Sequence, residues 1–425
     1  MTHSFTATKN HGDKPTDILV IGAGVVGLSC AFRLVQEGKQ VLLIDHEQPG
    51  LGASFGNAGH IATEQVYPLA SPEVVRGALR YLLDSESPLR IRPAYLLSIL
   101  PWLLRFTWAS RQSAFDRGVS ALSALQKTSH ADMASLLDAA GAANLMHMDG
   151  HLVLVEDPKS VAAAKKEMAG LAKFGIETEW ISPSLVREIA PDIAAPIEGA
   201  MKFTGTGHVD DPHAVCKSLF AAYLAAGGKF LQTEVTSASS GGDGFTLSTS
   251  SGTTQHANSV VLSCGAWSKN LATELGYPIP LDTERGYHIT LAGIVPRFTI
   301  PVASYERKVI MTPMSCGLRM TGTVEFGGLT LPPDPNRFVL LTRHMNALLG
   351  GTPTSNMSTW MGFRPSLPDH LPVLGRAPHD RNLYFAFGHQ HLGLTLAGVT
   401  ARIIASQVMG RDPQIDLTPF AADRF

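Results

Sequence analysis

Hydrophobic residues lie along the chain in short β-branched runs that alternate with longer amphipathic stretches. The first run covers Ile18 to Ile21, and glycines and a helical pattern that ends near Gly38 follow it. A second apolar run covers Val41 to Ile44. Short continuous apolar runs of this kind are typical of buried parallel strands. The order strand, helix, strand therefore predicts a βαβ unit at the start of an α/β fold.

A glycine-rich turn joins the first predicted strand to the helix. Gly22, Gly24 and Gly27 form the pattern G-x-G-x-x-G, and Asp45 follows the second strand. The first glycine permits a tight turn, the second lets backbone N–H groups approach a pyrophosphate, and the third lets helix and strand pack closely. The helix N-terminus then faces the anion, and Asp45 can accept hydrogen bonds from ribose hydroxyls. With all these parts in order, the unit predicts a dinucleotide site.

The same order of elements returns near the C-terminus. Leu383 to Phe387 form another apolar run, a glycine loop follows, and a helical pattern covers about Gly393 to Met409. His389 and His391 in this loop form H-x-H, but a metal site would need a third ligand that the motif does not supply. We therefore expect no metal here. The loop instead predicts a second helix N-terminus that faces bound charge.

Length, charge and cysteine spacing narrow the possible classes of protein. The chain has 425 residues, which favours two domains. Its formal net charge of -2 lacks the basic excess of a nucleic-acid-binding protein. The four cysteines show neither zinc nor disulfide spacing, which favours the cytoplasm. The polar composition of residues 1–16 predicts a flexible tail, which lacks the apolar core of a signal peptide. No apolar run along the chain is long enough for a membrane span.

Three motifs, in order along the chain, resemble one family. They are GASFGNAG at 52–59, GFRPSLPDHLPVLG at 362–375 and GHQHLGLT at 388–395. They resemble the D-amino-acid oxidase-like flavoproteins, and among these the bacterial FAD-dependent D-amino acid dehydrogenases, including those that act on D-proline-like acids. The resemblance implies an α/β fold in which a Rossmann-like FAD-binding domain is interleaved with a mixed-sheet substrate-binding domain. The expected FAD-binding segments are 17–80, 205–285 and 355–425, and the expected substrate-binding segments are 81–204 and 286–354.

The resemblance also implies bound FAD, and we expect no covalent link, because the motif at His60 does not closely match that of relatives with a histidyl–flavin bond. Adenine and pyrophosphate would lie at the N-terminal βαβ unit, and the flavin would lie at the N-terminus of the last helix. The residues expected to contact FAD are Gly22, Gly24, Val25, Val26, Gly27, Asp45, His46, Ser54, Asn57, Ala58, Gly59, Val235, Cys264, Gly265, Trp267, Arg364, Gly388, His389, His391, Leu392, Gly393, Leu394 and Thr395.

The motif G-F-R-P supplies the strongest candidate for substrate binding. The resemblance implies that Arg364 binds the substrate carboxylate, for which a guanidinium can make two parallel hydrogen bonds. The alternative from the residues alone is an ordinary salt bridge between Arg364 and Asp369. Tyr287, His391 and His60 are the further catalytic candidates, and an ordinary strand is the alternative for Tyr287.

The implied reaction is oxidation of a D-amino acid to an imino acid by hydride transfer from the alpha carbon to the flavin. Electrons would pass to a quinone or another acceptor that is not oxygen. Two alternatives remain at this point. One is a glycine or sarcosine oxidase that uses oxygen directly, and the other is a non-catalytic FAD-binding redox protein.

One segment differs in composition from the rest of the chain. Residues 89–112 are rich in leucine and tryptophan, carry four arginines and contain Pro101, which predicts two short helices or one kinked helix. This mixture suits an element that lies in a membrane interface. The alternative is a helical layer buried against the substrate-binding domain. The resemblance favours a peripheral enzyme on the cytoplasmic face of a membrane.

Overall fold

A mixed sheet of eight strands forms one half of the computed structural model, which describes residues 16–83, 87–242, 244–351 and 356–425. The predicted βαβ unit is confirmed, since β1 pairs in parallel with β2 on one side and with β13 on the other. The strand order is β10-β2-β1-β13-β12-β11, with β20 beside β13 and β19 beside β20. The strands are β1 Thr16–Ile21, β2 Val41–Asp45, β10 Lys229–Gln232, β11 Val235–Gly241, β12 Gly244–Thr249, β13 Thr254–Leu262, β19 Val373–Arg376 and β20 Leu383–Phe387.

Helices cover both faces of this first sheet. Alternate residues of β1 are therefore buried on opposite sides of it. Ile18 and Val20 belong to one hydrophobic cluster, and Leu19 and Ile21 belong to another. On the first side, α1 packs against α7 and α10, and α10 packs against α4. These helices are α1 Val25–Gln36, α4 Gln112–Ala139, α7 Pro212–Ala225 and α10 Gly393–Val408, and the second cluster includes residues of α8 Ser268–Glu274.

A second mixed sheet, of nine strands, forms the other half of the molecule. Its strand order is β18-β14-β17-β16-β15-β6-β8-β7, with β4 beside β17. The strands are β4 Leu89–Ile91, β6 His151–Val155, β7 Thr178–Ile181, β8 Gly199–Phe203, β14 Asp282–Ala292, β15 Val302–Ser304, β16 Val309–Met314, β17 Gly317–Phe326 and β18 Met357–Ser366. The helices of this half are α2 Pro72–Leu83, α3 Leu96–Ala109, α5 Val161–Leu171, α6 Pro183–Ile189 and α9 Pro335–Leu349.

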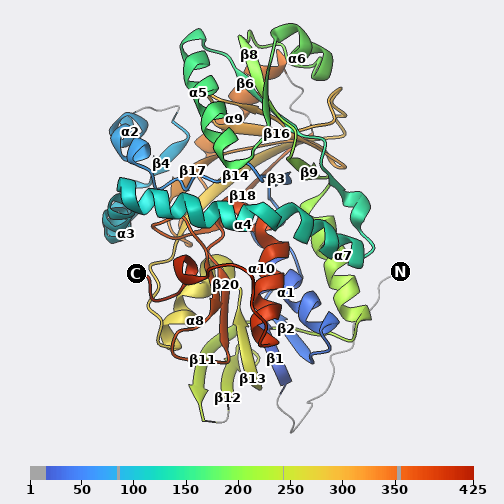
Figure 1. Cartoon of the computed structure of the whole chain (residues 1–425), viewed down its shortest axis with the longest axis vertical. Coiled ribbons are helices and arrows are strands. Elements are labelled where there is room, and N and C mark those ends of the chain that lie inside the picture. The colour runs from blue at the N-terminus through green and yellow to red at the C-terminus, as the bar shows by residue number, and fades with distance from the viewer. Residues whose placement is uncertain (1–15, 84–86, 243, 352–355) are drawn as a thin grey trace.

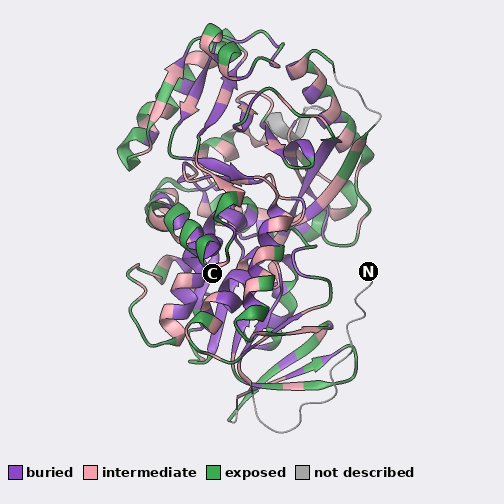
Figure 2. Ribbon diagram, turned by 90° about the vertical axis from the view of Figure 1, so that its right-hand side faces the viewer, coloured by how far each residue is buried: buried purple, intermediate pink, exposed green. Residues whose placement is uncertain are grey.

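The two halves interleave along the chain. Figure 1 shows the first sheet in the lower half and the second in the upper half, with α4 running across between them. A small sheet, β3-β9-β5, adds His60–Ile61, Gly207–Val209 and Met146–His147 near the middle. Figure 2 shows buried residues inside both halves and exposed residues on the outer helices.

One strand falls on the other side of the expected domain boundary at residue 355. β18 pairs with β14 over ten residue pairs and so belongs to the second sheet. Its sequence carries no signal for this choice, because the pairing partner of a strand is set by distant residues.

The segment 89–112 begins with the short strand β4, and its proline then lies inside one helix rather than between two. After the turn η1, Pro93–Tyr95, α3 runs from Leu96 to Ala109 with Pro101 inside it. Trp102 on its inner face is buried, and its indole N–H donates to the carbonyl of Ser366 at 3.3 Å. In the described ranges, neither α3 nor any other helix has the length and hydrophobicity that a membrane span requires.

Candidate active site

The glycine turn after β1 is shaped by close backbone contacts. Gly22 has a φ of +103°, which disfavours any residue with a side chain. A Cβ on Gly27 would overlap the carbonyl oxygen of Gly22, so the third glycine is needed for packing. The hydroxyl of Ser263, at the end of the neighbouring strand β13, donates to the carbonyl of Ile21 at 2.7 Å and so holds the start of the turn. The first turn of α1 therefore lies directly on the sheet.

The N-terminus of α1 has no cap from its own N-cap residue and lies beside several of the residues expected to bind FAD. Gly24 is the N-cap residue and makes no side-chain hydrogen bond. The N–H of Val25 donates to the hydroxyl of Ser54 at 2.9 Å, and the carboxylate of Asp45 accepts from the N–H of Ala23 at 2.6 Å. Backbone N–H groups at such an end attract an anion.

The N-termini of α1 and α10 converge on the same narrow space. Its lining includes Val25, Ser54, Asn57 and Leu394. The helix α10 begins at Gly393, and its N-cap residue, Leu392, makes no side-chain capping hydrogen bond. Two uncapped helix ends and the loop 52–59 thus meet where the sequence predicted the cofactor.

The loop 52–59 is held by polar contacts to the second sheet. Asn57 accepts from the N–H of Gly59 through its side chain at 2.8 Å. Its carbonyl accepts from the guanidinium of Arg319 at 2.8 Å, and the carbonyl of Gly56 bonds to Nδ1 of His288 at 3.0 Å. Ala58 lies within this held loop. These contacts tie the loop to β17 and β14.

Other expected FAD residues lie around the end of β2. Nδ1 of His46 is 3.0 Å from the carboxylate of Asp45, and the rings of His46 and Trp267 are 6.2 Å apart. Cys264 donates to the carbonyl of Ile21 at 3.3 Å and precedes Gly265, which has a φ of +54°. Val235 begins β11, three residues after Gln232, which pairs with Asp45.

Arg364 lies on the second sheet and makes no ion pair with Asp369. Its guanidinium donates from Nη1 to the carbonyl of Thr323 at 3.1 Å. Asp369 instead binds the guanidinium of Arg424 at 2.7 Å, so the salt-bridge alternative is wrong. Burial lowers the pKa of Arg364, and the nearby carboxylate of Glu284 opposes this shift. Arg364 therefore keeps hydrogen-bonding capacity for a ligand.

The backbone beside Arg364 is unusual. Thr323 has a φ of +62°, and β17 shifts its register against β14 between Arg285 and Tyr287. A threonine in this region is strained, and such strain gathers at functional sites. The guanidinium of Arg364 packs directly on Gly286, where the Cβ of any other residue would collide with it. This register shift is a β-bulge in β17, and it directs the carbonyl of Thr323 toward the guanidinium of Arg364.

Tyr287, a further expected catalytic residue, does not share a face with Arg364. Glu284 is the register partner of Arg364, and Tyr287 lies three residues further along β14, on the opposite face. Its hydroxyl donates to Glu325 at 3.0 Å and accepts from the N–H of Asp334 at 3.0 Å. The ring is fully buried, and both hydrogen-bond partners of its hydroxyl belong to the second half of the molecule.

The two histidines of the loop after β20 have different surroundings. His389 is buried, and Nε2 bonds to the hydroxyl of Thr400 at 2.9 Å. Burial lowers its pKa to about 4. His391, in the turn η6 Gln390–Leu392, has an exposed side chain. Burial and then the charge of Arg364 lower the pKa of His391.

Packing brings Arg364, His391 and His60 to one region. The turn η6 packs against β18, which carries Arg364, and α10 packs against β3, which begins at His60. The hydroxyl of Thr395 in the first turn of α10 accepts from the N–H of Ala62 at 3.0 Å. The side chain of His370 links η6 to Glu284, since it lies 2.8 Å from Gln390 and 3.3 Å from Glu284.

A model of the DAO family, described as FAD dependent oxidoreductase, matches residues 17–407. The chain belongs to this family. It is 31% identical to a D-amino-acid oxidase of Bradyrhizobium diazoefficiens, over 96% of this chain and 98% of that protein. It is 32% identical to D-amino acid dehydrogenase 2 of Pseudomonas aeruginosa, over 94% of this chain and 97% of that protein.

Solved structures show the same DAO-family fold. A glycine oxidase from Geobacillus kaustophilus has a TM-score of 0.74 at 22% identity and covers 97% of this chain and 99% of its own. An L-proline dehydrogenase from P. horikoshii has a TM-score of 0.73 at 18% identity, covering 97% and 98%. The expected fold class is therefore confirmed.

The residues of this chain fit the FAD that the family uses. The N-termini of α1 and α10, whose N-cap residues make no side-chain hydrogen bond, the glycine turn and the carboxylate of Asp45 supply groups suited to pyrophosphate and ribose. FAD supplies an electron acceptor for hydride when it is bound.

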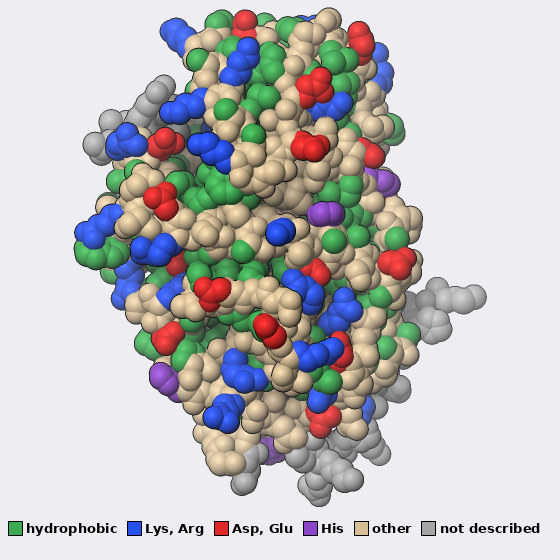
Figure 3. All heavy atoms as spheres, viewed as in Figure 1, with side chains coloured by type: hydrophobic (Ala, Val, Ile, Leu, Met, Phe, Trp, Pro, Cys, Tyr) green, Lys and Arg blue, Asp and Glu red, His purple; other side chains and the backbone are tan. Residues whose placement is uncertain are grey.

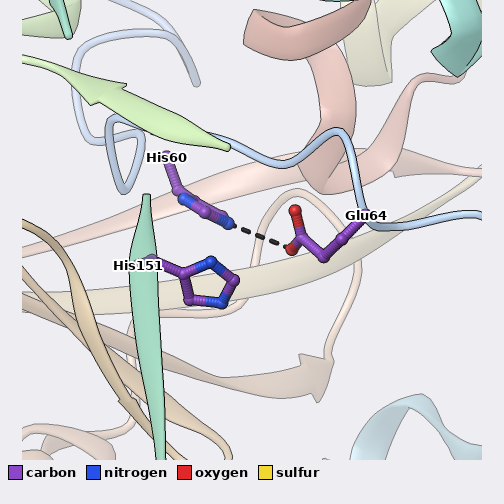
Figure 4. A group of neighbouring side chains, drawn as sticks. All are labelled: His60, Glu64 and His151. Carbon is purple, nitrogen blue, oxygen red and sulfur yellow. Dashed lines mark hydrogen bonds and ion pairs between the residues drawn. The ribbon is translucent and has the colours of Figure 1, made fainter. Parts of the chain in front are cut away.

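Several residues of this region could not be recognised from the sequence. Ser263, Glu284 and Thr323 carry no local motif, and they matter only because strands place them under the glycine turn or beside Arg364. The same is true of Glu64 and His151, which the structure brings to His60 (Figure 4).

Proposed function

We propose that the protein oxidises a D-amino acid at its alpha carbon, with FAD as the hydride acceptor. The single observation that carries the proposal is Arg364, an arginine without a carboxylate partner of its own beyond the neighbouring Glu284, on the sheet that faces the loop 388–395. A bidentate pair with the substrate carboxylate would fix the alpha carbon in one position. The relatives named as D-amino acid oxidase and dehydrogenase support this choice.

The chain's own residues would act by orientation and electrostatics. Arg364 would hold the carboxylate, and the bulge at Thr323 would hold Arg364. The uncapped N-terminus of α10 would stabilise negative charge on the reduced cofactor, by about 0.3 to 2 kcal/mol. His391, whose side chain is exposed and which feels the charge of Arg364, would contact the substrate.

Anaerobic reduction of the bound FAD tests the reaction directly. The yellow protein is mixed without oxygen with D- and L-amino acids, glycine and sarcosine, and D-proline and D-hydroxyproline are included as the first cyclic substrates. The proposal expects bleaching of the flavin absorbance by D-amino acids and by cyclic D-imino acids. Bleaching by glycine or sarcosine alone, with peroxide release in air, would support the oxidase alternative. A protein that no amino acid bleaches would be a binder rather than this enzyme.

We further propose that electrons pass to a quinone at a membrane surface, through contact of the outer face of α3. Leu97, Leu104 and Trp108 are 85%, 65% and 65% exposed and lie on one side of the helix. The guanidinium of Arg111 lies 3.1 Å above the ring centre of Trp108. In Figure 3, hydrophobic and basic side chains lie together at the left edge, where Figure 1 draws α3. Apolar residues beside arginines suit an anionic lipid surface.

Sedimentation with lipid vesicles tests this contact. Wild-type protein is expected to sediment with vesicles of phosphatidylglycerol and phosphatidylcholine, and Leu97→Ser with Leu104→Ser is expected to stay in the supernatant. Trp102 is unsuitable for substitution because it is buried. The control is Val295→Ser, since Val295 is 88% exposed but lies away from α3 in the sequence. Equal sedimentation of both variants, or none of the wild type, would remove the proposed contact.

A further inference from the structure

The side chains of His60, Glu64 and His151 converge from three separate segments. His60 begins β3, Glu64 lies in the loop after β3, and His151 begins β6. One ligand atom from each residue lies within 4.8 Å of the others. Figure 4 shows the imidazole of His60 directed at the carboxylate of Glu64, with the ring of His151 beside the pair. All three are shielded from solvent, with side-chain exposures of 12% and 5% for the first two.

The hydrogen bonds of His60 leave a lone pair directed at an anion. Nδ1 lies 2.9 Å from the carbonyl oxygen of Gly207, which can only accept, so Nδ1 carries a proton. Nε2 lies 3.0 Å from Oε1 of Glu64. An unprotonated Nε2 and a carboxylate oxygen both accept, and such a contact requires a cation between them or beside them. The cation is either a second proton on His60 or a metal ion.

Two further observations would have no purpose if His60 and Glu64 only shared a proton. Oε2 of Glu64 is buried and has no hydrogen-bond partner. His151 brings a second imidazole to the same point, and its Nδ1 lies 2.9 Å from the hydroxyl of Thr206. Thr206 and Gly207 are consecutive, so one short segment binds Nδ1 of His60 and Nδ1 of His151. Metal-binding histidines are commonly held in this way by an oxygen on the other ring nitrogen.

We propose that His60, Glu64 and His151 form a site for a divalent transition metal ion, with zinc as the first candidate. Two imidazoles and one carboxylate are a known zinc ligand set that leaves a further position for water or another ligand. At metal–ligand distances of about 2.0 to 2.2 Å, two ligand atoms on one zinc ion lie on the order of 3 to 4 Å apart. The 3.0 Å between Nε2 of His60 and Oε1 of Glu64 lies in this range, and separations in the group as large as 4.8 Å would shorten as the side chains close on the ion. The site goes beyond the proposed oxidation and does not depend on it.

Zinc binding to the full-length, FAD-loaded protein tests the proposal without reference to turnover. The protein is treated with EDTA, desalted and equilibrated with zinc sulfate, and bound zinc is measured by elemental analysis after gel filtration. Wild type is expected to retain about one zinc ion per chain, and zinc is expected to raise the melting temperature. Glu64→Gln and His151→Gln are expected to bind zinc roughly 100-fold more weakly or worse.

A surface histidine gives the matched control. His147 lies on β5 of the small sheet, and its Nε2 is 2.9 Å from the carboxylate of Asp210, which follows β9. Both side chains are 38% exposed. His147→Gln is expected to keep the zinc. FAD absorbance and the melting temperature in EDTA show whether each variant folds, and His151→Gln decides alone if Glu64→Gln does not fold. A wild type that retains no zinc, or zinc that only His147→Gln removes, overturns the proposal.

Discussion

Replacement of Arg364 by methionine tests how the substrate carboxylate is held. The change removes the guanidinium but keeps a chain of similar length, and it leaves the carbonyl of Thr323 without its donor at 3.1 Å. A hydrogen bond that involves a charged group contributes about 1.5 to 3 kcal/mol, so loss of two to the substrate costs about 3 to 6 kcal/mol. Since about 1.4 kcal/mol is a tenfold change, kcat/KM is expected to fall by roughly 100-fold to 10,000-fold.

The assay is anaerobic stopped-flow reduction of FAD by the D-amino acid that bleaches wild type fastest. FAD absorbance should show that Arg364→Met still binds the cofactor. Arg364→Lys should recover only part of the rate, because an ammonium group cannot form two parallel bonds. The corresponding D-amino acid amide lacks the carboxylate, so wild type and Arg364→Met should reduce at similar rates with it.

Arg424 provides the control arginine for this experiment. It binds Asp369 in the same region of the chain, and Arg424→Met should lower stability while kcat/KM stays within about twofold. The reasoning is refuted if Arg364→Met retains near-wild-type kcat/KM, or if Arg424→Met loses as much.

Three further outcomes are expected. Tyr287→Phe should lower the free energy of unfolding by about 1 to 3 kcal/mol in urea titrations, because the buried carboxylate of Glu325 and the N–H of Asp334 lose its hydroxyl, and a large loss of kcat/KM would place the residue at the substrate site. Asp45→Ala should release FAD more readily on gel filtration than wild type, and unchanged retention would contradict its ribose role. Burial lowers the pKa of His389 to about 4, so the unfolded chain takes up a proton below about pH 6.5 that the folded chain does not. Stability should therefore be highest above that pH and fall by about 1.4 kcal/mol per pH unit below it on account of this residue, and urea titrations of His389→Gln should show a shallower fall between pH 6.5 and 5.

The sequence by itself determined the elements whose signals are local. The strand, glycine turn, helix and acid of residues 16–45 and the strand–loop–helix of residues 383–408 lie where the pattern predicted them. Each depends on side-chain periodicity and on glycine conformations within a short window, which the local sequence specifies. The three family motifs then identified the fold and the cofactor over nearly the whole chain.

Tertiary structure decided which of the predicted residues face one another. Strand alternation separates Tyr287 from its neighbours, but only the pairing of β14 with β18 shows that Arg364 lies on the other face. Likewise, the sequence offered Arg364 as a partner for Asp369, but the C-terminal segment brings Arg424 to it. The group of His60, Glu64 and His151 exists only because β6 and β9 lie beside β3. Such contacts depend on strand order and register, which residues far apart in the chain fix together and which no short window of sequence contains.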